Sequence, residues 1–267
     1  MSVDKYGITK LNETKAGGLE WFNKWDNTKL RKLGTTTETD PYDPRLKITC
    51  GQPDRYVEIK GDGVARFRSD KPVTSMRLWV EGPWLNTEIT AFAKKVNVMT
   101  DIQLRSRSNH LTSGTAYQCV FGDYVVSWRA DKKITMAVEP MHPIYVRYIV
   151  TNTFGGFPQD QYVGYKQVTR TIGGNKVLVE GFINTNGDRI TWVKDMEFTF
   201  DGSNVKCTAS GINEEYRQKC INQGDKVAND LTKACLWLNP SKRCWLRLNE
   251  STGWNLKWYS VREINPA

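Results

Sequence analysis

The residues best suited to chemistry gather between Asp101 and Pro143, a stretch that holds both histidines of the chain, His110 and His142. An imidazole titrates near neutral pH and can accept or donate a proton there. Polar and apolar residues alternate along much of this stretch, as they do in a β-strand, and the alternation breaks at turn residues. We therefore expect its strands to present a functional face.

The first strand of this stretch carries four polar side chains on one face, because strand side chains repeat every two residues. They are Gln103, Arg105, Arg107 and Asn109. A guanidinium matches a carboxylate with two parallel hydrogen bonds. The pattern predicts that this face binds an anionic group of a ligand. The alternative is a solvated strand face whose arginines pair with the protein's own carboxylates.

A later strand, QYVGYKQVTRTI, adds a tyrosine and two cations. Alternation places Tyr162, Lys166 and Arg170 on one face and Tyr165 on the other. A tyrosine can protonate a leaving oxygen, and a cation can stabilise a developing negative charge. The alternative is that these residues form ordinary strand surface.

A metal site is a second and less favoured hypothesis. His110, Glu139 and His142 would supply two imidazoles and a carboxylate, a common ligand set for zinc or iron. They can meet only if Gly122 is a bulge in one long strand, which gives a meander of three strands. A glycine inside a strand often marks a bulge, so we favour this arrangement. Apart from this possible divalent metal, no cofactor is predicted.

Composition narrows the class of partner. The net charge is +9, which favours a polyanionic partner. No run of five or more Lys and Arg residues occurs, so we expect an acidic polysaccharide and no nucleic acid. No apolar segment is long enough to span a membrane. The oligomeric state is left open.

Cysteine usage points to an exported protein. None of the six cysteines forms a C-x-x-C pair, so a structural zinc site is not expected. An even number of widely spaced cysteines suits disulfide bonds, whose pairing stays open. The alternative is that they are buried free thiols of a cytosolic protein. The polar start MSVDKYGITK shows no signal peptide, and we expect a secreted or extracellular protein whose signal has been removed. The cysteines are Cys50, Cys119, Cys207, Cys220, Cys235 and Cys244.

The element pattern predicts an all-β protein with few short helices. Strand signals recur every eight to fifteen residues and are separated by turn residues. We expect one β-sandwich domain over residues 1–267, with an N-terminal arm and loops over 1–50. Residues 200–245 are predicted to form a loop-rich insertion with one short helix around Asn213–Cys220.

Several segments carry a resemblance to a known class. The segments NTEITAFAKK, RSRSNH, YVGYKQV, KVLVEGFIN and SVREI are similar to jelly-roll domains of the concanavalin A-like lectin and glucanase type. Among these the chain more closely resembles polysaccharide lyases and related secreted proteins. The lyases carry R-x-E-x-R, Q-x-H and Y-x-K-x-G-x-Y strands. This chain matches them partly, through Arg105 and Arg107, Asn109-His110, and Tyr162 and Lys166.

The resemblance implies cleavage of a uronate-containing polysaccharide by β-elimination. Gln103, Arg105, Arg107, Asn109 and Arg170 would then bind the substrate and neutralise its carboxylate. His110 would be the base, Tyr162 or Tyr165 the acid, and Lys166 a further cation. The alternative is a glycan-binding or surface structural module of the same fold without catalysis. The polymer and the endo or exo mode of cleavage stay open.

Overall fold

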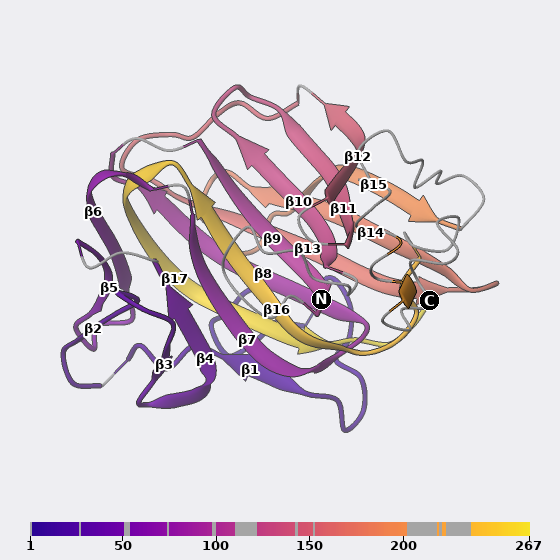
Figure 1. Ribbon diagram of the computed structural model, residues 1–267, viewed down its shortest axis with the longest axis horizontal. Coiled ribbons are helices and arrows are strands. Elements are labelled where there is room, and N and C mark those ends of the chain that lie inside the picture. The colour runs from indigo at the N-terminus through magenta and orange to yellow at the C-terminus, as the bar shows by residue number, and fades with distance from the viewer. Residues whose placement is uncertain are drawn as a thin grey trace.

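The protein is a β-sandwich of two antiparallel sheets packed face to face (Figure 1). The computed structural model describes residues 2–26, 28–50, 54–73, 75–97, 100–109, 122–141, 144–151, 153–201, 218, 221–222 and 236–267. The predicted all-β jelly roll is confirmed. Of the helix expected around Asn213–Cys220, Gln218 is described, and it is helical.

The nine-stranded sheet is built from strands spread over the whole chain. Its spatial order is β15 (Val193–Phe200), β14 (Lys176–Asn184), β13 (Tyr162–Ile172), β8 (Thr87–Lys95), β17 (Ser251–Glu263), β6 (Ala65–Val73), β5 (Arg55–Ile59) and β2 (Arg31–Leu33), with β1 (Glu20–Phe22) also paired to β17. The last long strand therefore lies in the middle of the sheet, between β8 and β6.

The eight-stranded sheet packs against it. Its spatial order is β12 (Ile144–Thr151), β11 (Ile134–Met141), β10 (Asp123–Arg129), β9 (Asp101–Ser108), β16 (Ser241–Asn249), β7 (Met76–Trp84), β4 (Asp43–Thr49) and β3 (Glu38–Asp40). Strand β16 begins at Ser241, so the predicted loop-rich insertion over 200–245 ends earlier than expected.

The core forms where the inward faces of the two sheets meet. Alternation sends Ile89 and Val179 inward from one sheet and Leu104 and Leu246 inward from the other, and all four are fully buried. Burial of one such side chain contributes about 1.5–3 kcal/mol. The large aromatic content is used mainly here. The completely buried tryptophans of this core are Trp25, Trp84, Trp128 and Trp254.

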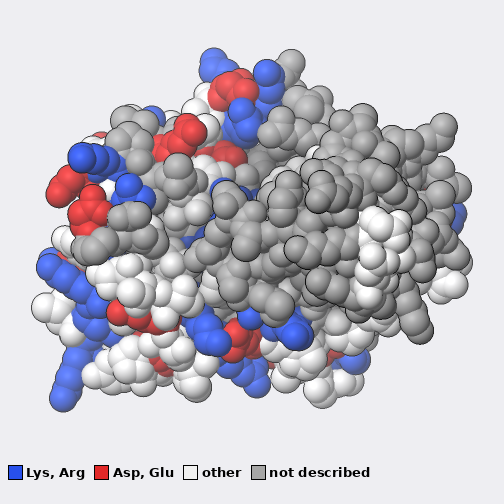
Figure 2. Space-filling view, viewed as in Figure 1, with Lys and Arg blue, Asp and Glu red and all other residues white. Residues whose placement is uncertain are grey.

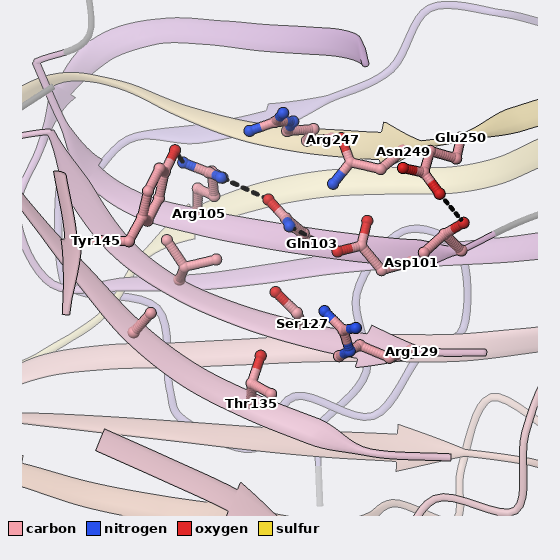
Figure 3. Close-up of a pocket in the computed structure, with 13 residues that line it drawn as sticks. Asp101, Gln103, Arg105, Ser127, Arg129, Thr135, Tyr145, Arg247, Asn249 and Glu250 are labelled. Carbon is pink, nitrogen blue, oxygen red and sulfur yellow. Dashed lines mark hydrogen bonds between the residues drawn. The ribbon is translucent and has the colours of Figure 1, made fainter. Parts of the chain in front are cut away.

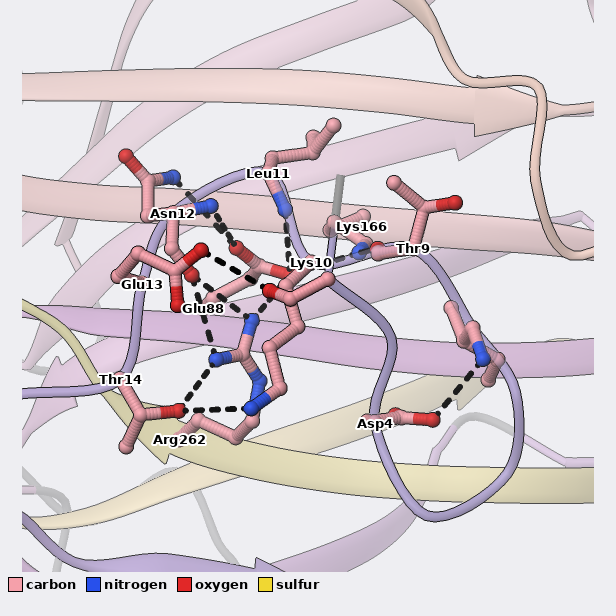
Figure 4. A network of polar contacts seen from close by, with 12 residues as sticks. Asp4, Thr9, Lys10, Leu11, Asn12, Glu13, Thr14, Glu88, Lys166 and Arg262 are labelled. Carbon is pink, nitrogen blue, oxygen red and sulfur yellow. Dashed lines mark hydrogen bonds and ion pairs between the residues drawn. The ribbon is translucent and has the colours of Figure 1, made fainter.

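The N-terminal arm lies over the outer face of the nine-stranded sheet and is tied to a buried carboxylate (Figure 4). The Glu88 carboxylate pairs with the Lys166 ammonium at 2.7 Å and with the Arg262 guanidinium at 2.7 Å. It also accepts hydrogen bonds from the backbone N–H groups of Leu11 and Asn12. The first part of the arm predicted over residues 1–50 thus closes a polar centre. The later part is not an arm, because β2, β3 and β4 belong to the two sheets.

Figure 2 shows one face of the molecule, on which Lys and Arg are interspersed with Asp and Glu along the upper, left and lower edges, in the part of the chain that the structure describes. Within the described ranges, no helix combines the length and apolarity that a membrane crossing requires.

Candidate binding groove on the eight-stranded sheet

A groove of about 460 Å³ lies on the outer face of the eight-stranded sheet. Figure 3 shows side chains from neighbouring strands that rise on the same side of the sheet. Strand β9 supplies alternate residues, and β10, β11, β12 and β16 supply the rest. The polar lining includes Asp101, Gln103, Arg105, Ser127, Arg129, Tyr145, Arg247, Asn249 and Glu250.

Strand register places these side chains in rows across the sheet. In one row Ser127 lies opposite Gln103, Gln103 opposite Arg247, and Arg247 opposite Arg77. Directly opposed side chains lie about 4.5–5.5 Å apart at their Cβ atoms, so groups in a row can contact one ligand together. The predicted polar face of β9 is therefore part of a groove, and Gln103 and Arg105 line it as expected.

Arg105 is held from several sides at one end of the groove. Its guanidinium lies 3.1 Å from the Asp123 carboxylate and 3.2 Å from the Glu139 carboxylate. It also donates to the Gln103 side-chain oxygen and the Tyr145 hydroxyl. Burial lowers the pKa of Arg105, but the charges around it outweigh burial, and the net pKa is raised. Arg105 is thus a fixed cation whose charge the protein itself already balances.

A glycine permits this carboxylate arrangement. A Cβ atom on Gly122 would lie 2.6 Å from the Glu139 side chain, a separation that forces a shift. The Gly122 N–H also donates to the Glu139 carbonyl at 2.7 Å. The absence of a side chain at Gly122 therefore leaves room for the Glu139 side chain, which reaches Arg105.

Tyr145 carries the phenol of the groove. Its ring is 37% exposed, and the Arg105 guanidinium lies 5.2 Å from the ring centroid. Because the Tyr145 oxygen accepts a hydrogen bond from Arg105 at 2.9 Å, its own hydrogen is available for donation elsewhere. Burial raises the pKa of Tyr145 to about 12, so the phenol keeps its proton at neutral pH.

Arg247 and Arg77 are two further cations, which lie directly opposite each other on β16 and β7. Neither makes an ion pair with a carboxylate among the described residues. The Arg77 Nε and Nη1 atoms and the Arg247 Nε atom are buried without a hydrogen-bond partner in that part of the chain. Burial, followed by the charges of Arg247 and Arg105, lowers the pKa of Arg77 to about 10. Like charges opposed in this way are destabilising unless an anion lies near them.

A buried aromatic layer supports these cations. The Trp79 and Trp245 rings meet edge to face at 6.3 Å between centroids. The Arg105 guanidinium lies 4.4 Å from the Trp245 centroid, and the Arg77 guanidinium lies 5.5 Å from it. Such cation–π contacts stabilise a cation that has lost water. These rings are buried, so they position arginines and do not form a platform for stacking.

The structure corrects the position of Arg107. Two residues of β9, Ser106 and Arg107, face the single residue Cys244 of β16, and Arg107 has a φ of 50°. This β-bulge turns Arg107 inward, where its guanidinium donates to the carbonyls of Leu85 and Trp237. Burial lowers the pKa of Arg107 to about 10. Simple alternation was therefore wrong for Arg107, which does not join Arg105 in the groove.

The bulge also moves Asn109 away from the predicted face. The Asn109 side-chain oxygen accepts a hydrogen bond from the backbone N–H of Lys242. The backbone N–H of Asn109 donates to the Gly122 carbonyl. Strands β9, β10 and β11 are consecutive neighbours, and Gly122 connects Asn109 with Glu139 at one end. The direct pairing of β9 with β10, expected for the three-stranded arrangement, is therefore observed, whereas the predicted bulge at Gly122 depends on residues 110–121, which lie outside the described residues.

The histidines lie outside the described residues. His110 and His142 therefore have no structural account, and neither does the proposed metal set that they would form with Glu139. In the described part of the chain, the carboxylate of Glu139 serves as a partner of Arg105.

The candidate residues of β13 lie on the nine-stranded sheet. Tyr165 is buried in the core, Lys166 is paired with Glu88, and Tyr162 and Arg170 lie on the outer face of the nine-stranded sheet. The two-residue alternation predicted along β13 is correct. The structure does not bring these residues together with Arg105, because β9 and β13 belong to different sheets.

Two of the six cysteines lie within the described residues. Cys50 and Cys244 are buried free thiols, so the predicted disulfide framework is wrong for these two. Cys244 lies within β16, and burial raises the pKa of its thiol to about 12. Each packs as a small apolar side chain in the core. Cys119, Cys207, Cys220 and Cys235 lie outside the described residues.

The sequence contained a signal for the groove residues that were missed. In MRLWVE and RCWLRLN, arginine and tryptophan share one face at a spacing of two, which places Arg77 with Trp79 and Arg247 with Trp245. In PIYVRY the same spacing exposes Tyr145. Alternation indicates which residues share a face, but the pairing of β7, β16 and β12 around β9 is needed to bring them to one groove.

Comparison with known proteins supports the fold. No protein-family profile and no curated protein sequence matches the chain. Among solved structures, it is similar to the exoplasmic/lumenal domain of VIP36, crystallised with Ca²⁺ and Man3GlcNAc, with a TM-score of 0.52 and 10% identity over 86% of this chain and 91% of that chain. It is also similar to the β-glucanase of Bacillus licheniformis, with a TM-score of 0.44 and 10% identity over 92% of this chain and 98% of that chain. For the alginate lyase vAL-1 from a Chlorella virus, the TM-score is 0.38 and the identity 8%, over 78% of this chain and 85% of that chain. The two-sheet sandwich and the similarity to the VIP36 domain show that the chain has the concanavalin A-like jelly-roll fold that its strand segments resemble.

Proposed function

We propose that the groove on the eight-stranded sheet binds an acidic polysaccharide. The observation that carries the proposal is the opposed pair Arg77 and Arg247, which lacks a carboxylate partner among the described residues. A ligand carboxylate would accept hydrogen bonds from Arg247 at the groove and reduce its repulsion with Arg77. Arg105 is not expected to bind the ligand carboxylate, because the Asp123 and Glu139 carboxylates already neutralise its charge.

The remaining lining suits sugar hydroxyls. Gln103, Ser127 and Asn249 present neutral polar groups along the groove. The Asp101 Oδ1 and Asn249 Oδ1 atoms are buried and accept no hydrogen bond from the described residues, whereas Asp101 Oδ2 accepts one from the Gln103 amide. A hydroxyl that donated to either oxygen would satisfy a group that is costly to leave unpaired. Arg247 together with these hydrogen-bonding groups can contact both the carboxylates and the hydroxyls of a uronate chain, although the carboxylates of Asp101 and Glu250 also line the groove.

The first test compares acidic and neutral polysaccharides. Affinity electrophoresis in gels that contain alginate, polygalacturonate or neutral laminarin would report binding through retardation of the protein. We expect retardation by at least one uronate polymer and none by laminarin. Equal retardation by laminarin would contradict the proposal that the ligand is an acidic polysaccharide.

The contact between Tyr145 and Arg105 favours a second candidate function, β-elimination at the same groove. In this reaction a base removes the proton from the carbon next to the carboxylate. The electron pair left on that carbon forms a C=C bond, and the glycosidic C–O bond breaks. The leaving oxygen takes a proton from an acid. Tyr145 holds its proton at neutral pH and can donate it, and the Arg105 guanidinium that donates to its oxygen fixes the position of the phenol. Arg247 would hold the carboxylate, and His110 stays the predicted base.

The unsaturated uronate that this reaction makes absorbs ultraviolet light, which gives a direct assay. We expect Tyr145→Phe to lower kcat by about 10²–10⁴-fold with little change in polymer binding, because it removes only the proton donor. A protein that binds a uronate polymer tightly yet releases no unsaturated product across the panel is a binding module.

A further inference from the structure

The outer face of the nine-stranded sheet carries a second charged surface, in the half that the N-terminal arm leaves uncovered. The arm occupies the half around Glu88, Lys166 and Arg262. The other half presents side chains from four adjacent strands, β6, β17, β8 and β13. We name these side chains the outer basic row. They are Arg66, Arg68, Lys94, Tyr162 and Lys257.

Strand register aligns this surface. Arg66 lies opposite Asn255, Asn255 opposite Lys94, and Lys94 opposite Tyr162. Adjacent strands are about 4.8 Å apart, so the three intervals span roughly 14 Å. The alignment runs across the strands, and its length is suited to several charges of a polymer rather than to one small anion.

Cations in the row are held over an aromatic ring. The Lys257 ammonium lies 4.7 Å from the Tyr162 ring centroid, and the Lys94 ammonium lies 5.7 Å from it. Lys257 also lies 5.6 Å from the Trp258 centroid. These contacts fix otherwise mobile lysines near one another, which reduces the entropy lost when they bind an anion.

The row has more positive charge than its own carboxylates balance. Arg66 pairs with Asp62, and Lys94 lies 3.9 Å from Asp160. Arg68 and Lys257 make no ion pair with a carboxylate in the described ranges. Arg68 donates hydrogen bonds to the Trp254 carbonyl and the Asn255 side-chain oxygen, and burial and the Arg66 charge lower its pKa.

We propose that the outer basic row is a second contact surface for an acidic polysaccharide, on the face opposite the groove. A nucleic-acid base would have to displace the lysine ammonium groups to stack on the ring face that they cover, whereas carboxylate or sulfate groups would pair with those ammonium groups directly. A long chain could then engage both faces of one molecule, or the row could hold a second chain.

The experiment separates this surface from the groove. The variant Lys94→Gln/Lys257→Gln removes two positive charges from the row, and the control Lys15→Gln/Lys176→Gln removes two elsewhere. Binding of polymeric alginate and of heparin would be measured at low and physiological salt, with Arg247→Gln as the groove variant. We expect the row variant to bind about tenfold more weakly at low salt, and the control to bind like wild type.

The affinities of the variants decide whether the outer basic row binds the polysaccharide. Equal affinity of the row variant and the control would overturn it, and circular dichroism would verify that both variants are folded. Tighter binding of a DNA duplex than of either glycan, lost in the row variant, would overturn the choice of polysaccharide. A row variant that weakens binding while Arg247→Gln does not would support the row and contradict the function proposed for the groove.

Discussion

Arg105 and Arg247 lie on neighbouring strands of one groove, yet their partners give them different roles. Arg105 is enclosed with two carboxylates, and Arg247 has none in the described part of the chain. Removing one partner of a buried ion pair costs about 3–5 kcal/mol, because the remaining charge stays buried. We expect Arg105→Gln to lower the free energy of unfolding by that amount, and Arg247→Gln to change it by less than about 1 kcal/mol.

Urea unfolding followed by tryptophan fluorescence would measure both variants. Equal destabilisation would show that Arg247 has a structural partner and would weaken the case for a ligand there. If Arg247→Gln is slightly more stable than wild type, the opposed arginine pair costs stability, which is expected of a site arranged for an anion.

Asp195 offers a test of pH dependence at a single residue. Burial raises its pKa to about 6 from the ordinary value of 3.8, although Trp128 donates a hydrogen bond to it. An acid whose pKa is higher in the folded state than in the unfolded state lowers stability as the pH rises through that interval. Asn can still accept the Trp128 hydrogen bond and does not ionise. We expect Asp195→Asn to be about 1 kcal/mol more stable at pH 7, after allowance for solvent screening.

Thermal unfolding of both proteins between pH 4 and pH 7 gives the comparison. The two melting temperatures should nearly coincide near pH 4, separate as the pH rises from 4 to 6, and keep a nearly constant difference above pH 6. A constant difference across this range would mean that ionisation of Asp195 is not its cause.

At the scale of elements, the N-terminal arm depends on the carboxylate beneath it. Burial raises the pKa of Glu88, but the charges of Lys166 and Arg262 outweigh burial and hold it below the usual value. Its contribution to stability is therefore complete above the ordinary pKa of 4.5 and is lost as the pH falls through the lower folded value. We expect Glu88→Gln to cost about 3–5 kcal/mol at neutral pH and less in acid.

Glu197 supplies the matched control, since it also pairs with a lysine but is half exposed. Glu197→Gln should change stability by less than about 1 kcal/mol. Limited proteolysis would show whether the arm detaches in Glu88→Gln. An arm equally resistant in the variant and in wild type would contradict the role assigned to Glu88.

Particular elements explain how much the sequence could predict. Alternation correctly divided β13 into its two faces and placed Gln103 and Arg105 on an outer face. It failed at Arg107, because a bulge reverses the phase and alternation contains no signal for it. Combining β9 with β13 in one site was the larger error. Both strands carried suitable residues, but only the sheet order shows that they belong to opposite layers.

At the scale of the whole molecule, the two outer faces of the sandwich differ in form. One has a groove with an opposed arginine pair, and the other has a row of cations across four strands beside the N-terminal arm. The inner faces are used for the core, so recognition depends on what each sheet presents outward. A basic protein of this construction can meet an acidic polymer on more than one side.

The most direct measurement is a calorimetric titration of a defined oligouronate into wild-type protein and Arg247→Gln. A charged hydrogen bond contributes about 1.5–3 kcal/mol, so the variant should bind roughly ten- to a hundredfold more weakly and unfold at the same temperature as wild type. Unchanged affinity in a folded Arg247→Gln protein would contradict the claim that the groove recognises a uronate through Arg247.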